Sequence, residues 1–537
     1  MFGGFRKKDK NKASRQAAAA AAAANSSSGS SSSSSSSTAA NNTASNSGSS
    51  TGRTSSPKVS HSSGKGAGGP TPHSSSGSGP AHLGGYANTS SSNGSAGGED
   101  RFSGLTLLTA MSLKDVNSSE QPRLFMRHLK LCHETFDFHE FTRLKEKEAK
   151  RLLLLGLVDF MNNPNTHIHE YMFPDIISMV SANLFRALPP ANDTWGDEED
   201  EPYLESTWPH LQIVYEFLLR FVVSSDVEPK PAKKYISHAF VLQLLGLFNS
   251  EDIRERDYLK TILHRIYGKF MALRAFIRKA IANIFLSCIY FEDHHNGIAE
   301  LLEILGSIIN GFAFPLKPEH KRFLTTCLIP LHKVRGLTNF QQQLEYCVTQ
   351  FVEKDNKMAE PVVKGLLRFW PEVNSPKQVQ FLHELEEILE LIQLPEFRTI
   401  QVPLFRRVAM CLESQHFQVA ERTLLLWNND YLFTLVTQNR REILPIVYDV
   451  LKRNSDAHWN SNVQLLSENV LKAFQDTDKQ FYDEVARASK AAAENKARAS
   501  VQRTELWEQF TEQAAAADSA KAHADPASAP AAPAAAS

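Results

Sequence analysis

Apolar residues recur at intervals of three and four positions between about residues 105 and 482. One such run comprises Ile298, Leu301, Leu302, Leu305, Ile308 and Ile309. This spacing places apolar side chains on one face of a helix, and the alternation typical of a strand is nowhere sustained. Clusters of Pro, Asn, Asp and Ser interrupt the pattern about every 12 to 20 residues, which predicts short helices with short connections. The predicted fold class is therefore all-α.

An internal repeat narrows the choice among all-α folds. Its markers are Pro318, Pro361, Pro403 and Pro445, which are separated by 43, 42 and 42 residues. The fifth and sixth residues after each proline are apolar in all four cases, namely Phe323-Leu324, Leu366-Leu367, Val408-Ala409 and Val450-Leu451. Because proline fits the first turn of a helix, each proline is predicted to begin a helix whose apolar pair faces a shared core. A second amphipathic helix follows, as in residues 417–427 after residues 403–412.

Two helices in about 42 residues match the HEAT and armadillo class of helical repeats. At that period, residues 104–482 would form a HEAT-like repeat domain of about eight or nine units. Such units stack into a solenoid, a superhelix with an extended concave face that grips other proteins. Residues 483–513, rich in Ala, Lys, Glu and Arg, are predicted to extend the last repeat as one helix.

The two ends of the chain differ in composition from the middle. Residues 1–103 are dominated by Ser, Ala, Gly, Asn and Thr, and residues 514–537 form an Ala/Pro-rich tail. Such segments bury too little apolar surface to offset their chain entropy, so both are predicted to be disordered arms. Ser56-Pro57 and Thr71-Pro72 in the first arm are candidate sites of proline-directed phosphorylation.

The charge balance limits the expected partners. The chain has 58 Lys and Arg against 59 Asp and Glu, which argues against binding to nucleic acid. No apolar stretch approaches the roughly 20 residues of a membrane helix, so no membrane insertion is expected. The basic cluster Arg6, Lys7, Lys8, Lys10 and Lys12 is interpreted as a solvated charge run, with a nuclear-localisation signal as the alternative. We expect a cytoplasmic protein, with a nuclear location left open.

No catalytic or metal-binding signature is present. The five cysteines Cys132, Cys288, Cys327, Cys347 and Cys411 are widely spaced and lack a CxxC arrangement, so neither a disulfide framework nor a zinc site is predicted. Glu292, Asp293, His294 and His295 supply metal-ligating groups, but adjacent side chains point apart. We interpret this segment as an acidic inter-helix loop, with Asn296 as N-cap of the next helix. We therefore expect no catalytic residues, no metal, no cofactor and no enzymatic activity.

Four stretches of the helical region carry long and specific sequences. They are VLQLLGLFNSEDIRERDYLKTILHRIYGKFMALRAFIRKAIANIFLSCIYFEDHHNGIAELLEILGSIING (residues 241–311), WPHLQIVYEFLLRF (208–221), SPKQVQFLHELEEIL (375–389) and HFQVAERTLLLWNN (416–429). These sequences resemble the B-prime regulatory subunits of serine/threonine protein phosphatase 2A, and the resemblance covers essentially all of the helical region. It implies a heterotrimer in which a separate catalytic subunit carries the chemistry and another HEAT-repeat subunit is the scaffold. It also implies that this chain selects substrates by binding short Leu-x-x-Ile-x-Glu motifs.

The resemblance further implies a peptide-binding groove. Its residues, all matching the family pattern, are Thr261, His264, Arg265, Tyr267, Arg274, Glu303, Ile304, Ile308, Lys317 and His320. Thr261, His264 and Arg265 lie at i, i+3 and i+4, on one helical stripe. Glu303 and Ile304 follow His264 and Arg265 by 39 residues, about one repeat, so their helices are predicted to stack at about 8–10 Å.

The expected roles in this groove follow from side-chain chemistry. Ile304, Ile308 and Tyr267 would receive the Leu and Ile of the peptide. Lys317 and His320 would form a cationic end that holds its Glu.

Two arginines complete the expected groove. Arg265 and Arg274 would hold acidic or phosphorylated residues between the anchors, because guanidinium matches carboxylate and phosphate bidentately. Taken singly, an arginine is more often solvated and an isoleucine on an amphipathic helix is often core. The interpretation therefore depends on the whole set.

Residues 196–202 (GDEEDEP) form an acidic loop flanked by Trp195 and Trp208. Its acidic residues are Asp197, Glu198, Glu199, Asp200 and Glu201. A solvated turn is the simplest interpretation of such a charge run. The resemblance implies instead that Glu198, Glu199 and Glu201 face the active-site region of the catalytic subunit.

A different HEAT-repeat adaptor, such as a nuclear-transport carrier or a scaffold protein, is the alternative. It shares the architecture, but it would prefer basic cargo and show acidic ladders on its concave face.

Overall fold

The computed structural model describes residues 113–189, 203–292 and 294–524. Every regular element in these ranges is helical, and none of the described residues forms a strand, which confirms the predicted all-α class. The predicted arms up to residue 112 and from residue 525, with both candidate phosphorylation sites and the N-terminal basic cluster, lie outside the described residues. Disorder of the arms therefore stays a prediction.

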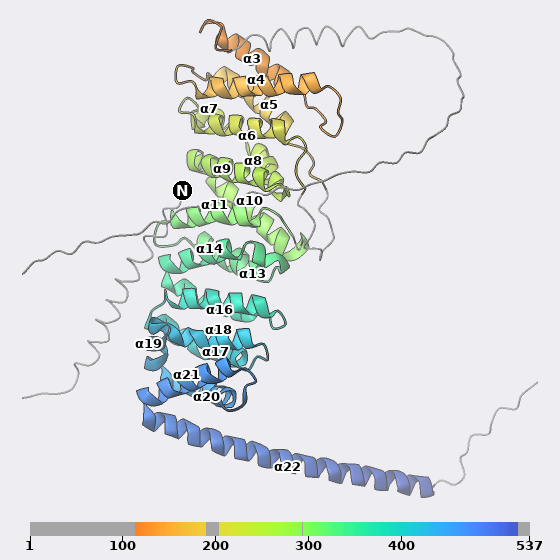
Figure 1. Cartoon of the computed structure of the whole chain (residues 1–537), viewed down its shortest axis with the longest axis vertical. Coiled ribbons are helices and arrows are strands. Elements are labelled where there is room, and N and C mark those ends of the chain that lie inside the picture. Colours follow the sequence, from red (N-terminus) through yellow and green to blue (C-terminus); the bar gives the residue numbers. More distant parts are fainter. Residues whose placement is uncertain (1–112, 190–202, 293, 525–537) are drawn as a thin grey trace, which may run out of the picture. The chain divides into compact units, whose positions relative to one another are not determined.

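One layer of helices runs through the described part of the chain, each helix packing on the next (Figure 1). Its members are α4 (Leu144–Asn162), α6 (Trp208–Val223), α9 (Ile253–Lys269), α11 (Ile298–Asn310), α14 (Gln341–Lys354), α16 (Ser375–Leu389), α18 (Phe417–Leu424) and α21 (Ser461–Thr477). Each pair of neighbours in this series is in contact. Helices from successive repeats therefore lie side by side, which is the stacking that the repeat length predicts.

A second layer covers the first. Its members are α3 (Gln121–Cys132), α5 (Phe173–Leu184), α8 (His238–Gly246), α10 (Arg274–Ser287), the continuous segment α12 (Pro318–Phe323), η5 (Leu324–Leu328) and α13 (Ile329–Leu331), then α15 (Ala359–Arg368), α17 (Leu394–Leu412) and α20 (Arg440–Ala457). Shorter elements join the layers, namely η1 (Glu170–Met172), α7 (Pro229–Ala232), η2 (Leu247–Asn249), η3 (Met271–Leu273), η4 (Cys288–Glu292), η6 (Arg335–Asn339), η7 (Asn356–Met358), η8 (Leu425–Asn428) and α19 (Asp430–Gln438). The architecture is the predicted HEAT-like repeat.

One continuous apolar core fills the space between the layers. Each apolar pair of the proline register contributes to it, since Leu324, Leu366, Val408 and Leu451 are all buried. All five cysteines are buried in the same core as thiols, in line with the absence of a disulfide pattern in the sequence. Burial of this apolar surface is what holds neighbouring repeats together.

The positions of the prolines differ in part from the prediction. Pro318 is the first residue of α12 and Pro361 the third of α15, so both lie in a first turn. Pro403 and Pro445 lie inside α17 and α20 instead, nine (403 − 394) and five (445 − 440) residues after the helix starts. The buried face of each helix already begins before its proline, so the helix starts ahead of it and includes the proline.

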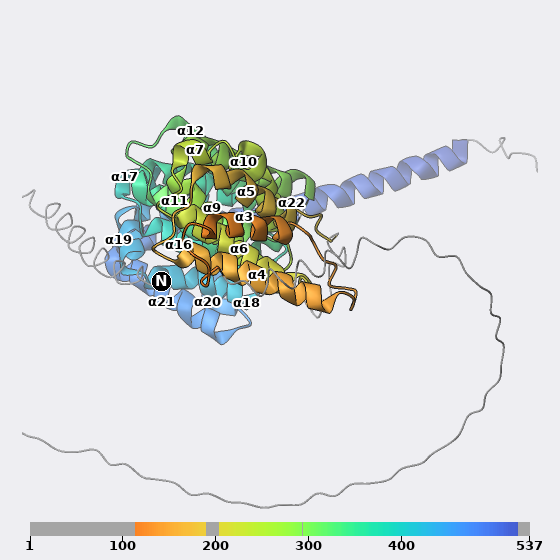
Figure 2. The ribbon, with the colours of Figure 1, turned by 90° about the horizontal axis from the view of Figure 1, so that it is seen from above.

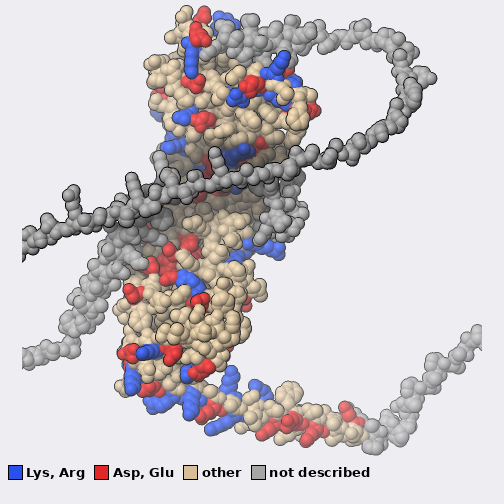
Figure 3. Space-filling model, viewed as in Figure 1, with Lys and Arg blue, Asp and Glu red and all other residues tan. Residues whose placement is uncertain are grey.

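The chain's last described helix, α22 (Lys479–Ala524), packs its beginning on α20 and α21 and continues with exposed side chains. Figure 2 shows it reaching away from the other helices, and Figure 3 shows side chains of both charges along it. The predicted helix of residues 483–513 lies inside α22. The prediction of disorder from residue 514 is wrong up to residue 524, because residues 514–524 are mostly alanine, the strongest helix former.

Candidate functional site

Four of the predicted groove residues lie on α9. The carboxylate of Asp252 caps the start of this helix by accepting a hydrogen bond from the backbone N–H of Arg254. Thr261, His264 and Arg265 are exposed on one stripe of the helix, as predicted. The helix therefore presents a polar and basic edge to solvent.

Side chains of α9 and α11 meet across the boundary between two repeats. His264 Nε2 lies 3.2 Å from Ser307 Oγ, and Lys260 Nζ lies 2.8 Å from Glu303 Oε2. The predicted stacking of these two helices is thus present, but Glu303 pairs with Lys260 rather than standing beside His264. Burial and the positive charge of Arg265 lower the pKa of His264, so its imidazole is neutral at pH 7.

Two arginines from α10 surround Tyr267 near the end of α9. Arg274 donates to the carbonyl oxygens of Tyr267 and Gly268 at 2.9 and 3.0 Å, and its guanidinium lies 5.2 Å from the centre of the Tyr267 ring. Arg278 Nη1 donates to the Tyr267 hydroxyl at 3.0 Å. Arg274 therefore caps the carbonyl end of α9 and fixes the tyrosine, which leaves fewer of its N–H groups for a ligand than predicted.

The α12 end of the surface is built on a ring stack. The His320 imidazole lies parallel to the Phe312 ring, with centroids 3.7 Å apart. Burial, Arg278 and Lys317 lower the pKa of His320, while Glu319 at 3.3 Å acts in the opposite direction. His320 is therefore a neutral hydrogen-bonding group at pH 7, and the positive charge predicted for this end comes from Lys317, since Arg278 pairs with Glu319 at 3.2 Å.

The two isoleucines belong to the core. Ile304 is 2% exposed and Ile308 is 6% exposed, because α11 turns Glu303 and Ser307 outward and the isoleucines inward. The structure therefore shows less open apolar wall between α9 and α11 than the sequence predicts. Tyr267 is 9% exposed, so it contributes only the edge of its ring to this apolar wall.

Two exposed cations at this surface stand apart from the network of ion pairs. Arg265 on α9 and Lys317, the N-cap residue of α12, are both exposed. Neither forms an ion pair with any of the acidic residues that the structure describes. Both charges are available to an acidic ligand.

Sequence reasoning missed three residues of this surface, Lys260, Ser307 and Arg278. Each contacts a side chain 41 to 43 residues away, since Arg278 also pairs with Glu319 at 3.2 Å. The repeat length, applied to polar residues as well as to apolar ones, was the signal that could have found them.

The predicted acidic loop, with Asp197 to Glu201, lies outside the described residues. Its described flanks are tied to α9. Arg186 donates to Glu205 Oε2 at 2.8 Å and to the two carboxylate oxygens of Glu255 at 2.8 and 3.0 Å. The two ends of the acidic loop are therefore joined to α9, the helix with four predicted groove residues, by a buried ion-pair network.

Glu292 and His295 form hydrogen bonds with residues on either side of their segment. Glu292 accepts a hydrogen bond from Ser287, and His295 Nδ1 accepts one from the N–H of Gly297. Burial lowers the pKa of His295 to about 4. The predicted N-cap role of Asn296 is wrong, because Gly297 is the cap position of α11 and the Asn296 side chain bonds to the Asn249 carbonyl instead. Asp293 lies outside the described residues.

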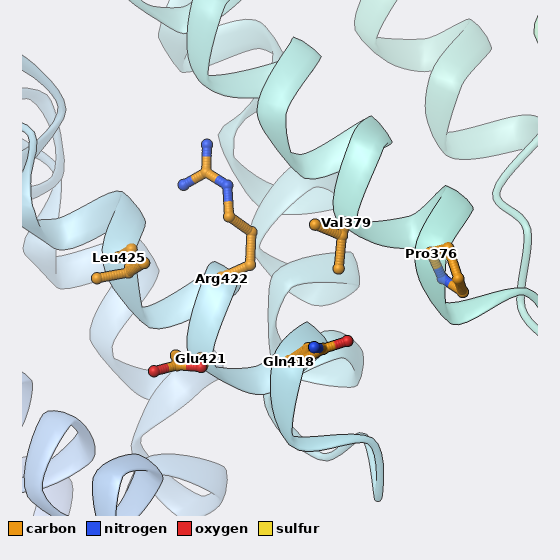
Figure 4. A pocket seen from close by; sticks show the side chains of 6 residues that line it. All are labelled: Pro376, Val379, Gln418, Glu421, Arg422 and Leu425. Carbon is orange, nitrogen blue, oxygen red and sulfur yellow. The ribbon is translucent and has the colours of Figure 1, made fainter. Parts of the chain in front are cut away.

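A shallow pocket of about 410 Å³ lies between α16 and α18, away from the predicted groove (Figure 4). It is lined by Pro376, Val379, Gln418, Glu421, Arg422 and Leu425. Arg422 pairs with Glu386 of α16, so its charge is already compensated. These lining side chains include no nucleophile and no histidine.

Comparison with known proteins identifies the family. The family model described as protein phosphatase 2A regulatory B subunit (B56 family) matches residues 110–514, a range that includes α9, α11 and α12. The chain belongs to the B56 family. The eta isoform of the 59 kDa B' regulatory subunit of serine/threonine protein phosphatase 2A from Arabidopsis thaliana is 52% identical over 408 residues, which cover 75% of this chain and 80% of that relative. The alpha isoform of the 56 kDa regulatory subunit from Mus musculus is 51% identical over 402 residues, covering 74% and 83%.

Membership of the B56 family decides between the classes considered from the sequence. The chain is a regulatory subunit of protein phosphatase 2A and not an enzyme, as predicted. Among solved structures, Kap121p bound to Nup53p is 15% identical to this chain, with a TM-score of 0.39. The match covers 73% of this chain and 38% of Kap121p, and these values are too low to add to the family assignment. In the part of the chain that the structure describes, no helix combines the length and apolar character needed to cross a membrane.

Proposed function

We propose that this B56-family chain selects substrates for protein phosphatase 2A by binding short Leu-x-x-Ile-x-Glu motifs across α9, α11 and α12. In this proposal a separate catalytic subunit performs the dephosphorylation, and a HEAT-repeat scaffold subunit joins the two. The observation that supports it most is the packing of α9 on α11, which holds the exposed guanidinium of Arg265 beside the contact of His264 with Ser307.

The acidic residues of a motif would meet two cations on this surface. Arg265 can hold a carboxylate or phosphate through two parallel N–H bonds, and Lys317 supplies a point charge at the α12 end. Beside Lys317, the buried Nδ1 of His320 has no hydrogen-bond partner among the described residues. Because buried polar atoms are nearly always satisfied, this nitrogen would gain a peptide partner only if the ring turned toward solvent on binding.

The apolar residues of the motif would contact Tyr267, Ile304 and Ile308. Since both isoleucines are nearly covered, the Leu and Ile of a peptide would enter only after side chains of α9 move to other rotamers. Changes of this size at an interface are common on binding and leave the backbone in place.

Selection by this surface would act through proximity. A phosphoprotein held by a short flexible tether experiences an effective concentration of enzyme in the millimolar range, so a weak substrate is dephosphorylated without any chemistry by this chain. The acidic loop is a second element of the proposal, in which Glu198, Glu199 and Glu201 position the catalytic subunit. Equal holoenzyme assembly and equal activity on a tethered substrate in wild type and Glu199→Lys would remove the loop from the proposal.

A paired measurement tests the docking surface. A labelled Leu-x-x-Ile-x-Glu peptide is titrated with wild-type chain and with Arg265→Glu, and each protein is also used to capture the phosphatase catalytic and scaffold subunits. Charge reversal at an exposed bidentate site is expected to weaken peptide binding at least about tenfold and to leave subunit capture unchanged. Arg406→Glu, at an exposed arginine on α17, is the matched control and should bind the peptide like wild type. Wild-type protein that binds neither the peptide nor the subunits would contradict the proposal.

A further inference from the structure

Three metal-ligating side chains converge where α14 packs on α16, away from the peptide groove. They are Glu345 of α14 and His383 and Glu387 of α16. His383 and Glu387 are four residues apart, so they lie on the same face of their helix. One ligand atom of each of the three residues lies within 4.8 Å of the others.

The geometry is close to that of a zinc site with three protein ligands. Zinc lies about 2.0–2.2 Å from imidazole nitrogen and carboxylate oxygen, which in a tetrahedral site separates two ligand atoms by about 3.4 Å. His383 Nδ1 already lies 3.3 Å from Glu345 Oε1. Glu387 would close the remaining gap by rotation of its side chain, which has several accessible rotamers.

The surroundings of this cluster favour a cation. The Glu345 side chain is only 17% exposed, and it lies near the negative charges of Glu384 and Glu387 as well as the imidazole of His383. Glu384 cannot relieve this crowding, because its carboxylate bonds to His332 on the buried side of α16. A divalent ion between the carboxylates would remove their mutual repulsion.

We propose that Glu345, His383 and Glu387 form a binding site for a divalent transition metal of the Zn²⁺ class, with water as the fourth ligand. A mixed imidazole and carboxylate set suits zinc, whereas Mg²⁺ and Ca²⁺ prefer sites made of oxygen alone. The bound ion joins two adjacent repeats and stabilises their stacking. The five cysteines do not compete in the folded chain, because all of them are buried.

The experiment uses the full-length chain, stripped with chelator and then titrated calorimetrically with ZnCl₂ at neutral pH. Wild type is compared with His383→Ala and with Glu345→Gln, and the exposed His416, which precedes α18, supplies the control variant His416→Ala. Because removal of a group that merely orients a ligand lowers metal affinity 10- to 100-fold, loss of a ligand is expected to weaken this site at least about tenfold. His416→Ala should retain it. Co²⁺ added to wild type should give the visible absorption of a tetrahedral site, and this signal should be lost in His383→Ala.

Three outcomes would overturn the proposal. The first is that His383→Ala and Glu345→Gln both bind zinc with the same stoichiometry and affinity as wild type. In that case the contact between His383 and Glu345 would be an ion pair only. The second is a Co²⁺ spectrum that is the same in wild type and His383→Ala. The third is an equally tight site for MgCl₂, which would contradict the assigned class of metal. His383 is largely exposed and Glu345→Gln preserves shape, so folded variants are expected, and circular dichroism of the metal-free proteins checks this.

Discussion

Replacement of Arg186 tests whether a buried ion-pair network holds the groove helix in place. The guanidinium bridges Glu205 and Glu255 through bonds of 2.8 to 3.0 Å, and Tyr215 donates its hydroxyl to Glu255 at 2.6 Å. Glu255 on α9 is fully buried, and Glu205 is 9% exposed. The network therefore joins the flanks of the acidic loop to α6 and α9.

The magnitude follows from what Arg186→Ala leaves behind. Two carboxylates would remain in a buried site without their cation, and breaking such a pair costs about 3–5 kcal/mol. Arg453→Ala removes an ion pair with Glu413 in which both side chains are more than half exposed, and such pairs contribute about 0–1 kcal/mol. The expected contrast between the two variants is thus several kcal/mol.

Urea unfolding followed by circular dichroism is the assay for both variants. Because repeat arrays can unfold in segments, hydrogen exchange of α6 and α9 should be measured beside the global transition. Arg186→Ala should lower the midpoint and speed exchange in these helices, whereas Arg453→Ala should do neither. If the two variants were equally stable, the network would not stabilise the fold as argued.

Three smaller predictions concern packing and pH. Gly365→Ala should destabilise the chain by about 1–3 kcal/mol in urea unfolding, because its new Cβ would lie 2.2 Å from Ile329 Cγ2; an unchanged midpoint would contradict the packing. Gly156→Ala, inside α4 with open space around it, should stabilise by about 0.5–1 kcal/mol in the same assay. Burial lowers the pKa of His332, but the charge and hydrogen bond of Glu384 outweigh it and raise the pKa above its usual value. The ion pair of His332 with Glu384 therefore stabilises the fold fully below about pH 6.5 and loses its effect as pH rises through the raised pKa of His332. The difference in urea midpoint between wild type and His332→Gln should accordingly become smaller as pH rises.

The repeat architecture could be predicted because the apolar register is a property of the chain itself. The burial of Leu324 and of Leu366 follows from a helical period of 3.6 and a repeat of about 42 residues. Helix starts were less predictable, as Pro403 shows, because the buried apolar face of α17 begins with Phe397, before this proline.

Residue spacing predicted which helices form the candidate site, but not which side chains contact each other across them. A step of 39 residues pairs His264 with Glu303, whereas the structure pairs it with Ser307 at 43 residues. The difference is one helical turn, or about 6 Å along the helix axis, and it depends on how far one helix slides along the next. The contact of Arg186 with Glu255 spans 69 residues, which is no multiple of the repeat, so no register could have suggested it.

Competition between peptides tests the central claim most directly. Full-length chain with a bound labelled Leu-x-x-Ile-x-Glu peptide is challenged with the same peptide unlabelled, and with variants in which Leu and Ile become Ala or Glu becomes Lys. The account predicts that the unlabelled parent competes fully, that each altered peptide competes at least about tenfold less well, and that Arg265→Glu protein shows little binding to any of them. Equal competition by the parent and the altered peptides would contradict recognition of the motif by this surface.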